Sequence, residues 1–230
     1  MLAMGRLAKA ALVIGAMAAF AGCSSDGKDP APDTTLLDVN EMRGALLQAA
    51  DIGPTWTAPA ESTDPNRLVS VCGGTTTAPP VPPGATAVAA PLVDEGDAGA
   101  QTLNQTALVY DDPSGAQAGL AALRAVADGC QASVSVPATV TNDKSEPAYT
   151  ETAAVQPLSQ GSWSGFAVIR HKQYERAHPG TADTAVAVLA TRNVLLVDAY
   201  AIYRLGSASG GSQFSSDWPK LVGTVVNRVG

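Results

Sequence analysis

The chain has 230 residues, enough for one full-sized domain after a short leader and too few for two such domains. Its 21 acidic residues outnumber its 14 basic residues and give a net charge of −7. This acidic balance argues against a protein that binds nucleic acid or adsorbs to anionic lipid headgroups.

The N-terminus has the order of features that is typical of a bacterial signal peptide. Arg6 and Lys9 precede residues 10–20, an uncharged and mainly apolar run, and polar sequence begins directly after Cys23. Residues 20–23, Phe-Ala-Gly-Cys, resemble the lipobox of bacterial lipoproteins, in which Leu is commoner than Phe at the first position. The resemblance implies a diacylglyceryl group on the Cys23 sulfur, cleavage before Cys23, and acylation of the new amino end with a chain such as palmitate. Residues 1–22 are therefore predicted to be a lipoprotein signal peptide.

Two other N-terminal segments compete with this interpretation. An uncleaved transmembrane helix needs about 17–25 apolar residues, and the run over residues 10–20 is shorter. A plain secretory signal usually ends in an Ala-x-Ala-like site, which is weaker here than the junction between Gly22 and Cys23.

Lipidation fixes the expected location of the rest of the chain. Loss of Arg6 and Lys9 changes the net charge from −7 to −9, so contact with the bilayer is expected from the acyl chains alone. Residues 23–35 are polar, contain two prolines and lack periodicity, which predicts a flexible tether. Residues 36–230 are then one domain on the extracytoplasmic face of the cell membrane.

The remaining two cysteines form an even pair. Once Cys23 is lipidated, Cys72 and Cys130 are left in an oxidising compartment. We predict a disulfide between them, which would close a loop of almost 60 residues. Two buried thiols and a metal-binding pair are the alternatives, and no third and fourth ligands are spaced near the two cysteines for the latter.

Helical signals open the domain. Asp38 is a candidate N-cap with Glu41 as its capping-box partner, and an apolar stripe then continues at helical spacing as far as Ala49. Pro54 ends this helix. Residues 57–100 are rich in Pro and Gly, which excludes long helices and central strands, so only Cys72 is expected to fix this stretch.

Regular structure is predicted again from residue 101. Residues 101–110 alternate as a strand, and a helix follows with Asp112 as N-cap, Pro113 at its first position and Gly129 at its end. The later strands share period-2 patterns and are expected over residues 132–136, 148–158, 163–171, 183–190 and 193–205. A last helix begins near Ser216. This order predicts a single α+β domain, an antiparallel sheet with flanking helices that cover one face.

No motif specifies a reaction. Residues 161–165, Gly-Ser-Trp-Ser-Gly, nearly match a nucleophile elbow, but Trp163 stands at the nucleophile position. His171 and His178 have no third ligand near them, so no metal site is predicted. No cofactor motif is present either, and we expect a protein that is not an enzyme.

One polar segment is a candidate ligand site. Arg170, His171 and Tyr174 belong to the densest polar stretch of the chain, which leaves the end of a predicted strand. Polar groups at a strand end can line a recess for an anionic or sugar-like ligand. The alternative is an exposed edge strand that is protected by charge.

Several short motifs resemble one family. They are residues 46–52 followed by Trp56, the first-half Cys72, residues 112–116 leading through an Ala-rich helix to Cys130, and residues 192–194 at the start of a returning strand. Together these resemble actinobacterial lipoproteins related to the extracellular sensor domain of the PknH-type receptor kinase. The resemblance implies an α+β sheet with flanking helices, a broad cleft and an extracellular ligand. The kinase-linked domain has two disulfides, whereas this chain can form one.

We therefore expect a membrane-tethered lipoprotein with a sensor-like domain that binds an unidentified envelope or extracellular ligand. The alternative is an envelope scaffold or protein-interaction lipoprotein with a protein partner and no small-molecule ligand. An enzyme with dispersed catalytic residues is the third possibility. Nucleic acid is not an expected partner.

Overall fold

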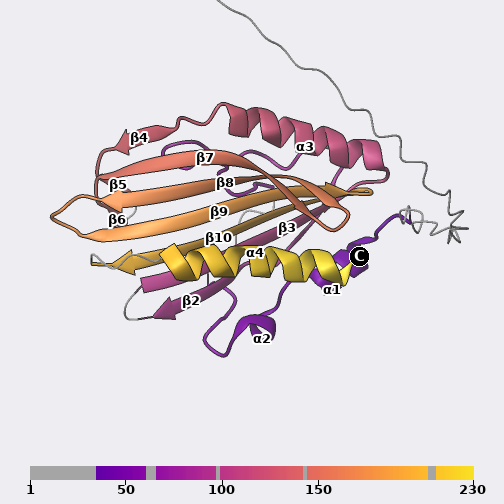
Figure 1. Cartoon of the computed structure of the whole chain (residues 1–230), viewed down its shortest axis with the longest axis horizontal. Helices are drawn as coiled ribbons and strands as arrows, with labels where there is room; N and C mark the ends of the chain where they lie inside the picture. Colours follow the sequence, from indigo (N-terminus) through magenta and orange to yellow (C-terminus); the bar gives the residue numbers. More distant parts are fainter. Residues whose placement is uncertain (1–34, 61–65, 97–98, 142–143, 207–210) are drawn as a thin grey trace, which may run out of the picture. The chain divides into compact units, whose positions relative to one another are not determined.

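A large antiparallel sheet organises the part of the chain that the structure describes (Figure 1). The computed structural model describes residues 35–60, 66–96, 99–141, 144–206 and 211–230. The predicted signal peptide, Cys23 and most of the predicted tether lie outside these ranges. The described residues belong to one compact unit.

Successive hairpins form the centre of the sheet. Its strands run in the order β1-β3-β10-β9-β8-β7-β4, and β2 pairs with β3 as well. The bounds of these strands are β1 Thr86–Ala89, β2 Leu92–Gly96, β3 Gly99–Val109, β4 Ser133–Val136, β7 Tyr149–Gln160, β8 Trp163–Tyr174, β9 Gly180–Thr191 and β10 Val194–Leu205. A separate small hairpin consists of β5 (Thr139–Thr141) and β6 (Lys144–Glu146). The predicted α+β class with an antiparallel sheet is confirmed.

The turn between β9 and β10 fixes the register of the central hairpin. Thr191 pairs with Val194, and Arg192 has a positive φ of 48°. The buried Asn193 side chain donates to the carbonyl of Tyr110 (2.7 Å) and both accepts from and donates to the backbone of Leu37. One turn residue therefore ties the hairpin to the end of β3 and to the start of the domain.

The segment predicted to be held only by Cys72 is fixed at several points, so that prediction was wrong. β1 and β2 lie end to end along the outer edge of β3, and Thr57 forms a bridge with Val93. Leu68 and Val71 are buried. Proline has no backbone N–H to donate to a neighbouring strand, so it disfavours central strands but permits short edge strands such as these.

The first helix is shorter than its apolar stripe predicted. The capping box of Asp38 and Glu41 is confirmed, but α1 spans Val39–Ala45 and a second short helix, α2 (Ala49–Ile52), follows. Between them, the N–H of Leu47 donates to Gln105 Oε1 (2.9 Å), and Gln105 Nε2 donates to the carbonyl of Leu47 (3.1 Å). The buried amide of Gln105 thus provides the backbone partners that a continuous helix would have supplied.

The two later helices follow their predicted signals to different degrees. α3 (Pro113–Asp128) begins as predicted, with the carboxylate of Asp112 accepting from the N–H of Gly115 (3.0 Å). α4 (Gly211–Arg228) begins earlier than the predicted Ser216, and Pro219 lies inside it. The missing N–H of Pro219 does not end the helix, because the residues around it pack a continuous apolar face on the sheet.

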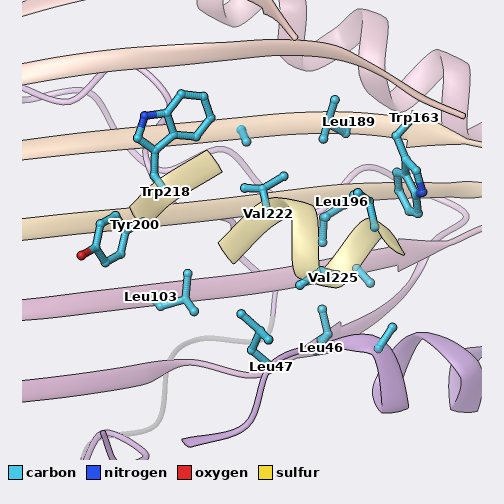
Figure 2. Close-up of a cluster of buried hydrophobic side chains, with 14 of the residues drawn as sticks. Leu46, Leu47, Leu103, Trp163, Leu189, Leu196, Tyr200, Trp218, Val222 and Val225 are labelled. Carbon is cyan, nitrogen blue, oxygen red and sulfur yellow. The ribbon is translucent and has the colours of Figure 1, made fainter. Parts of the chain in front are cut away.

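Helices cover both faces of the sheet, which corrects the prediction of one covered face. On the α4 face, Val222, Val225 and Trp218 of α4 pack over Leu196 and neighbouring strand residues, with Leu46 and Leu47 from the end of α1 beside them (Figure 2). On the α3 face, apolar side chains of α3 pack on the alternate strand residues, among them Phe166, Val168, Val188 and Val197. The strands β9 and β10 are apolar on both faces for this reason.

Candidate functional site

The polar stretch at the end of β8 is divided between the two faces of the sheet. Side chains alternate along a strand, so Arg170, Lys172 and Tyr174 share the α3 face with the core residue Val168. His171 points to the α4 face, where its Nδ1 lies 2.7 Å from Asp183 Oδ1. The structure therefore brings Arg170 and Tyr174 to one face and does not bring His171 to them.

Arg170 is held in a buried ion pair. Its Nη1 lies 3.6 Å from Glu151 Oε1, and the two side chains are 13% and 4% exposed. Burial lowers the pKa of the Arg170 guanidinium, and the Glu151 carboxylate opposes that shift. Glu151 Oε2 also accepts from the N–H of Gly74 (2.6 Å). Arg170 thus helps to hold a loop, which accounts for its charge without a ligand.

A glycine and a disulfide bring that loop onto the ion pair. Gly73 has a φ of +72°, and a Cβ at this position would lie 2.2 Å from Arg170 Nη1 and 2.5 Å from Glu151 Oε1. The predicted disulfide between Cys72 and Cys130 is present, with a Cα–Cα distance of 5.1 Å. It joins the residue before Gly73 to the segment that leaves α3.

Tyrosines and one lysine continue this polar cluster toward the strand ends. Lys172 Nζ lies 3.9 Å from the centroid of the Tyr149 ring and 2.7 Å from Glu146 Oε1. The hydroxyl of Tyr174 donates to the same carboxylate oxygen (3.2 Å). Burial, followed by the negative charge of Glu146, raises the pKa of Tyr149 to about 12. These tyrosines are neutral hydrogen-bonding groups at physiological pH.

An open recess lies beside this cluster, where several strands of the sheet end. We call it the strand-end recess. Its volume is 660 Å³, and its lining residues come from β2, β3, β8, β9 and β10 and from the segments next to them. The residues are Glu95, Gly96, Gly99, Ala100, Pro147, Tyr174, His178, Pro179, Gly180, Thr181, Tyr203, Arg204 and Leu205.

Two residues of the strand-end recess have buried polar atoms without a partner. Thr181 Oγ1 and Arg204 Nε make no hydrogen bond within the described part of the chain. Another nitrogen of the Arg204 guanidinium, Nη2, has a partner, because it donates to Gln213 Oε1 (2.7 Å). Both atoms are buried, and strand alternation puts Thr181 and Arg204 on the opposite side of the sheet from Tyr203, so these two atoms do not themselves face a ligand in the recess.

The structure therefore places the three predicted ligand residues in different environments. Tyr174 lines the strand-end recess, Arg170 is held in the buried ion pair and is not among the lining residues, and His171 points to the opposite face of the sheet. Sequence reasoning missed Thr181 and Tyr203. Their signal was the succession of hairpins, which returns the end of β8, the start of β9 and the end of β10 to the same edge of the sheet.

Within the ranges that the structure describes, no group of three or more His, Cys, Asp or Glu side chains is placed to hold a metal ion. Over the same ranges, none of the helices has the length and apolar character needed to cross a membrane.

Comparison with known proteins gives one solved structure of the same fold. No protein-family model matches the chain, and no curated protein matches it. The crystal structure of the extracellular domain of PknH from Mycobacterium tuberculosis matches with a TM-score of 0.53 and 15% sequence identity, covering 86% of this chain and 98% of that one. At this identity the likeness shows the fold alone. It confirms, as a matter of fold, the resemblance that the short motifs indicated.

Proposed function

We propose that this protein is an extracytoplasmic lipoprotein, anchored to the cell membrane through Cys23, whose domain binds a small ligand in the strand-end recess. The proposed role is sensor-like and not enzymatic. The recess itself is the observation that carries the proposal. Its 660 Å³ volume lies in the range of small-molecule sites, and a few polar groups stand among mainly apolar walls, as such sites require.

The chemistry of the recess favours a ligand with an apolar or ring-shaped body and a few polar groups. Tyr174 and Tyr203 offer aromatic surface with polar hydroxyl ends, and Pro179 and Leu205 offer apolar surface. The extracellular origin of the matching PknH domain supports a location outside the cytoplasm. The lipobox-like sequence before Cys23 supports the membrane anchor.

Native mass spectrometry tests ligand binding most directly. Protein purified from its own cell envelope is expected to carry an added small mass. Tyr203→Ala is expected to lose that mass, and Val126→Ala is expected to keep it, because Val126 is an exposed residue of α3 outside the recess. Wild-type protein without any added mass, or equal retention by both variants, would contradict binding in this recess.

The anchor has an independent test. Cells fed an alkyne fatty acid are expected to label the wild-type chain, and Cys23→Ala is expected to abolish the label. Label that persists in Cys23→Ala would refute anchoring at this residue, whatever the recess binds.

An alternative role in contact with a protein partner rests on one observation. Leu205 at the rim of the recess is 71% exposed, and Tyr203 beside it is 39% exposed. Exposed apolar side chains of this size favour a protein interface. The same native spectra separate the two roles, since a retained polypeptide and a retained small molecule differ in mass.

A further inference from the structure

Asp198 is a buried carboxyl group without a hydrogen-bond partner. It lies in β10 between Leu196 and Tyr200 of the α4 face, and it is 1% exposed. Neither Oδ1 nor Oδ2 accepts a hydrogen bond from any described residue. An isolated ionised carboxylate in such a place is so costly that the group normally takes up a proton instead.

The surroundings of Asp198 offer no compensating charge. Its neighbours across the sheet are Ala187 in β9 and Gln105 in β3. Leu46, which directly follows α1, and Val222 of α4 belong to the apolar cluster on this face (Figure 2). Within the described residues, no titratable or charged group on β3, β9, α1 or α4 acts on its pKa, which burial alone raises to about 7.

Gln105 is the polar side chain opposite Asp198, but its donors are already used. One amide has two N–H donors, and Gln105 Nε2 donates to the carbonyls of Leu47 (3.1 Å) and Ala90 (3.0 Å). Its Oε1 accepts from the N–H of Leu47 (2.9 Å). We call this set of three hydrogen bonds the Gln105 clamp. It joins the α1–α2 connection and the β1–β2 connection to the sheet.

We propose that Asp198 is a proton-binding site that controls the Gln105 clamp. While Asp198 carries its proton, the amide of Gln105 stays on Leu47 and Ala90. When the proton leaves, the carboxylate becomes a charged acceptor at the position that pairs with Gln105 across the sheet, and it competes with those two carbonyls for the N–H groups of the amide. Loss of the proton therefore loosens the α1–α2 connection.

The direction of the pH effect follows from the raised pKa. Between pH about 4 and about 7, the folded protein keeps a proton that the unfolded chain has lost. The stabilising effect is complete below the ordinary aspartate pKa of 3.8 and is lost as pH rises through the folded value of about 7. Each pH unit in this window is expected to lower the folding equilibrium constant about tenfold.

The test compares the pH dependence of stability in matched variants. Urea unfolding of the wild type, Asp198→Asn and Asp198→Val is followed from pH 4 to pH 8. Relative to both variants, the folding constant of the wild type is expected to fall about tenfold per unit between pH 4 and 7 and then to level. Asp128→Asn is the control, because Asp128 pairs with Arg124 at an exposed site on α3, and its curve is expected to stay parallel to the wild type. Parallel curves for the wild type and both Asp198 variants would overturn the proposal.

Hydrogen exchange tests the link to the clamp. The Leu47 amide is expected to exchange at equal rates in the wild type and Asp198→Asn at pH 5, and faster in the wild type at pH 7.5. If the exchange rate of the Leu47 amide in the wild type, divided by its rate in Asp198→Asn, were the same at pH 5 and pH 7.5, control of the clamp would be overturned. This would hold even if the unfolding curves supported the proton site. Asp198→Val keeps the test decisive if the asparagine variant does not fold, since it removes the same titratable group.

Discussion

Two carboxyl groups, Glu151 on the α3 face and Asp198 on the α4 face, are buried to nearly the same extent. They differ in whether the fold supplies partners for a carboxylate. Glu151 is 4% exposed and has an arginine and a backbone N–H as partners. Asp198 is 1% exposed and has none among the described residues. The comparison shows that partners, more than depth, decide whether a buried carboxyl group is expected to stabilise the fold as an anion.

The partners of Glu151 exist because an irregular loop reaches it. Gly74 can donate its N–H because the backbone there is free of the sheet, and the disulfide at Cys72 keeps the loop in place. Asp198 is surrounded by regular strands, whose backbone N–H groups already bond to one another. A regular sheet offers a buried side chain no spare donor.

The largest effect is expected from the disulfide that holds this loop. Replacing Cys72 and Cys130 with Ser removes a cross-link between residues 58 apart in sequence, and the chain-entropy model predicts a loss of about 4 kcal/mol in the free energy of unfolding. Urea denaturation at pH 7 measures it. A loss well below this value would contradict the chain-entropy account of this cross-link.

Glu151→Gln tests the partnered carboxylate itself. It leaves the guanidinium of Arg170 buried without a counter-charge, which is expected to cost about 3 kcal/mol of unfolding free energy. The double variant with Arg170→Met is expected to recover part of that loss, because no buried charge remains. Asp198→Asn is expected to leave the protein at pH 7 at least as stable as the wild type. If Glu151→Gln did the same, the proposed contrast between a partnered and an unpartnered buried carboxyl group would be refuted.

The sequence predicted the local elements better than the contacts between them. The capping box at Asp38, the N-cap at Asp112 and the short connection between the strands predicted over residues 183–190 and 193–205 are short-range signals, and each is present. The early end of α1 depends on Gln105, which is 58 residues away from Leu47 in sequence. No window along the chain contains both residues, so the apolar stripe alone predicted too long a helix.

The candidate site was predicted in part for the same reason. Tyr174 was found because polar residues gather near it, and the pairing of Cys72 with Cys130 followed from counting cysteines. The separation of Arg170 and His171 needed only the alternation of strand side chains. The burial of Arg170 needed Glu151 and Gly73, which reach it from another strand and a distant loop. Those contacts depend on sheet order, which sequence pattern does not specify.

Gly73→Ala probes how closely the loop approaches the ion pair. A left-handed φ costs a non-glycine residue about 1 kcal/mol, and the new Cβ would also displace Arg170 and Glu151, so a total loss of about 2 kcal/mol is expected. Gly84→Ala is the matched control, because Gly84 has a φ of +81° and open space around it. Thermal or urea unfolding of the two variants gives the difference. Equal losses would show that the contact with the ion pair adds nothing to the cost of the backbone conformation.

The smallest effect is expected at Asp51. Its contribution to stability changes with pH in the direction opposite to that of Asp198. Hydrogen bonds from Arg228 and from the N–H of Gln48 lower the pKa of the Asp51 carboxyl, so its stabilising effect is present above the ordinary value of 3.8 and is lost as pH falls through the folded value. Both side chains are about one-third exposed, and such a pair contributes no more than about 1 kcal/mol.

Asp51→Asn keeps an acceptor for Gln48 and removes the charge. Its unfolding free energy is expected to fall below that of the wild type at pH 6 and to converge with it below pH 3, whereas Asp198→Asn is expected to diverge from the wild type as pH rises. If the difference in unfolding free energy between Asp51→Asn and the wild type grew toward pH 8, part of the change in stability near neutral pH would come from the exposed Asp51. Its attribution to the buried Asp198 would then be weakened.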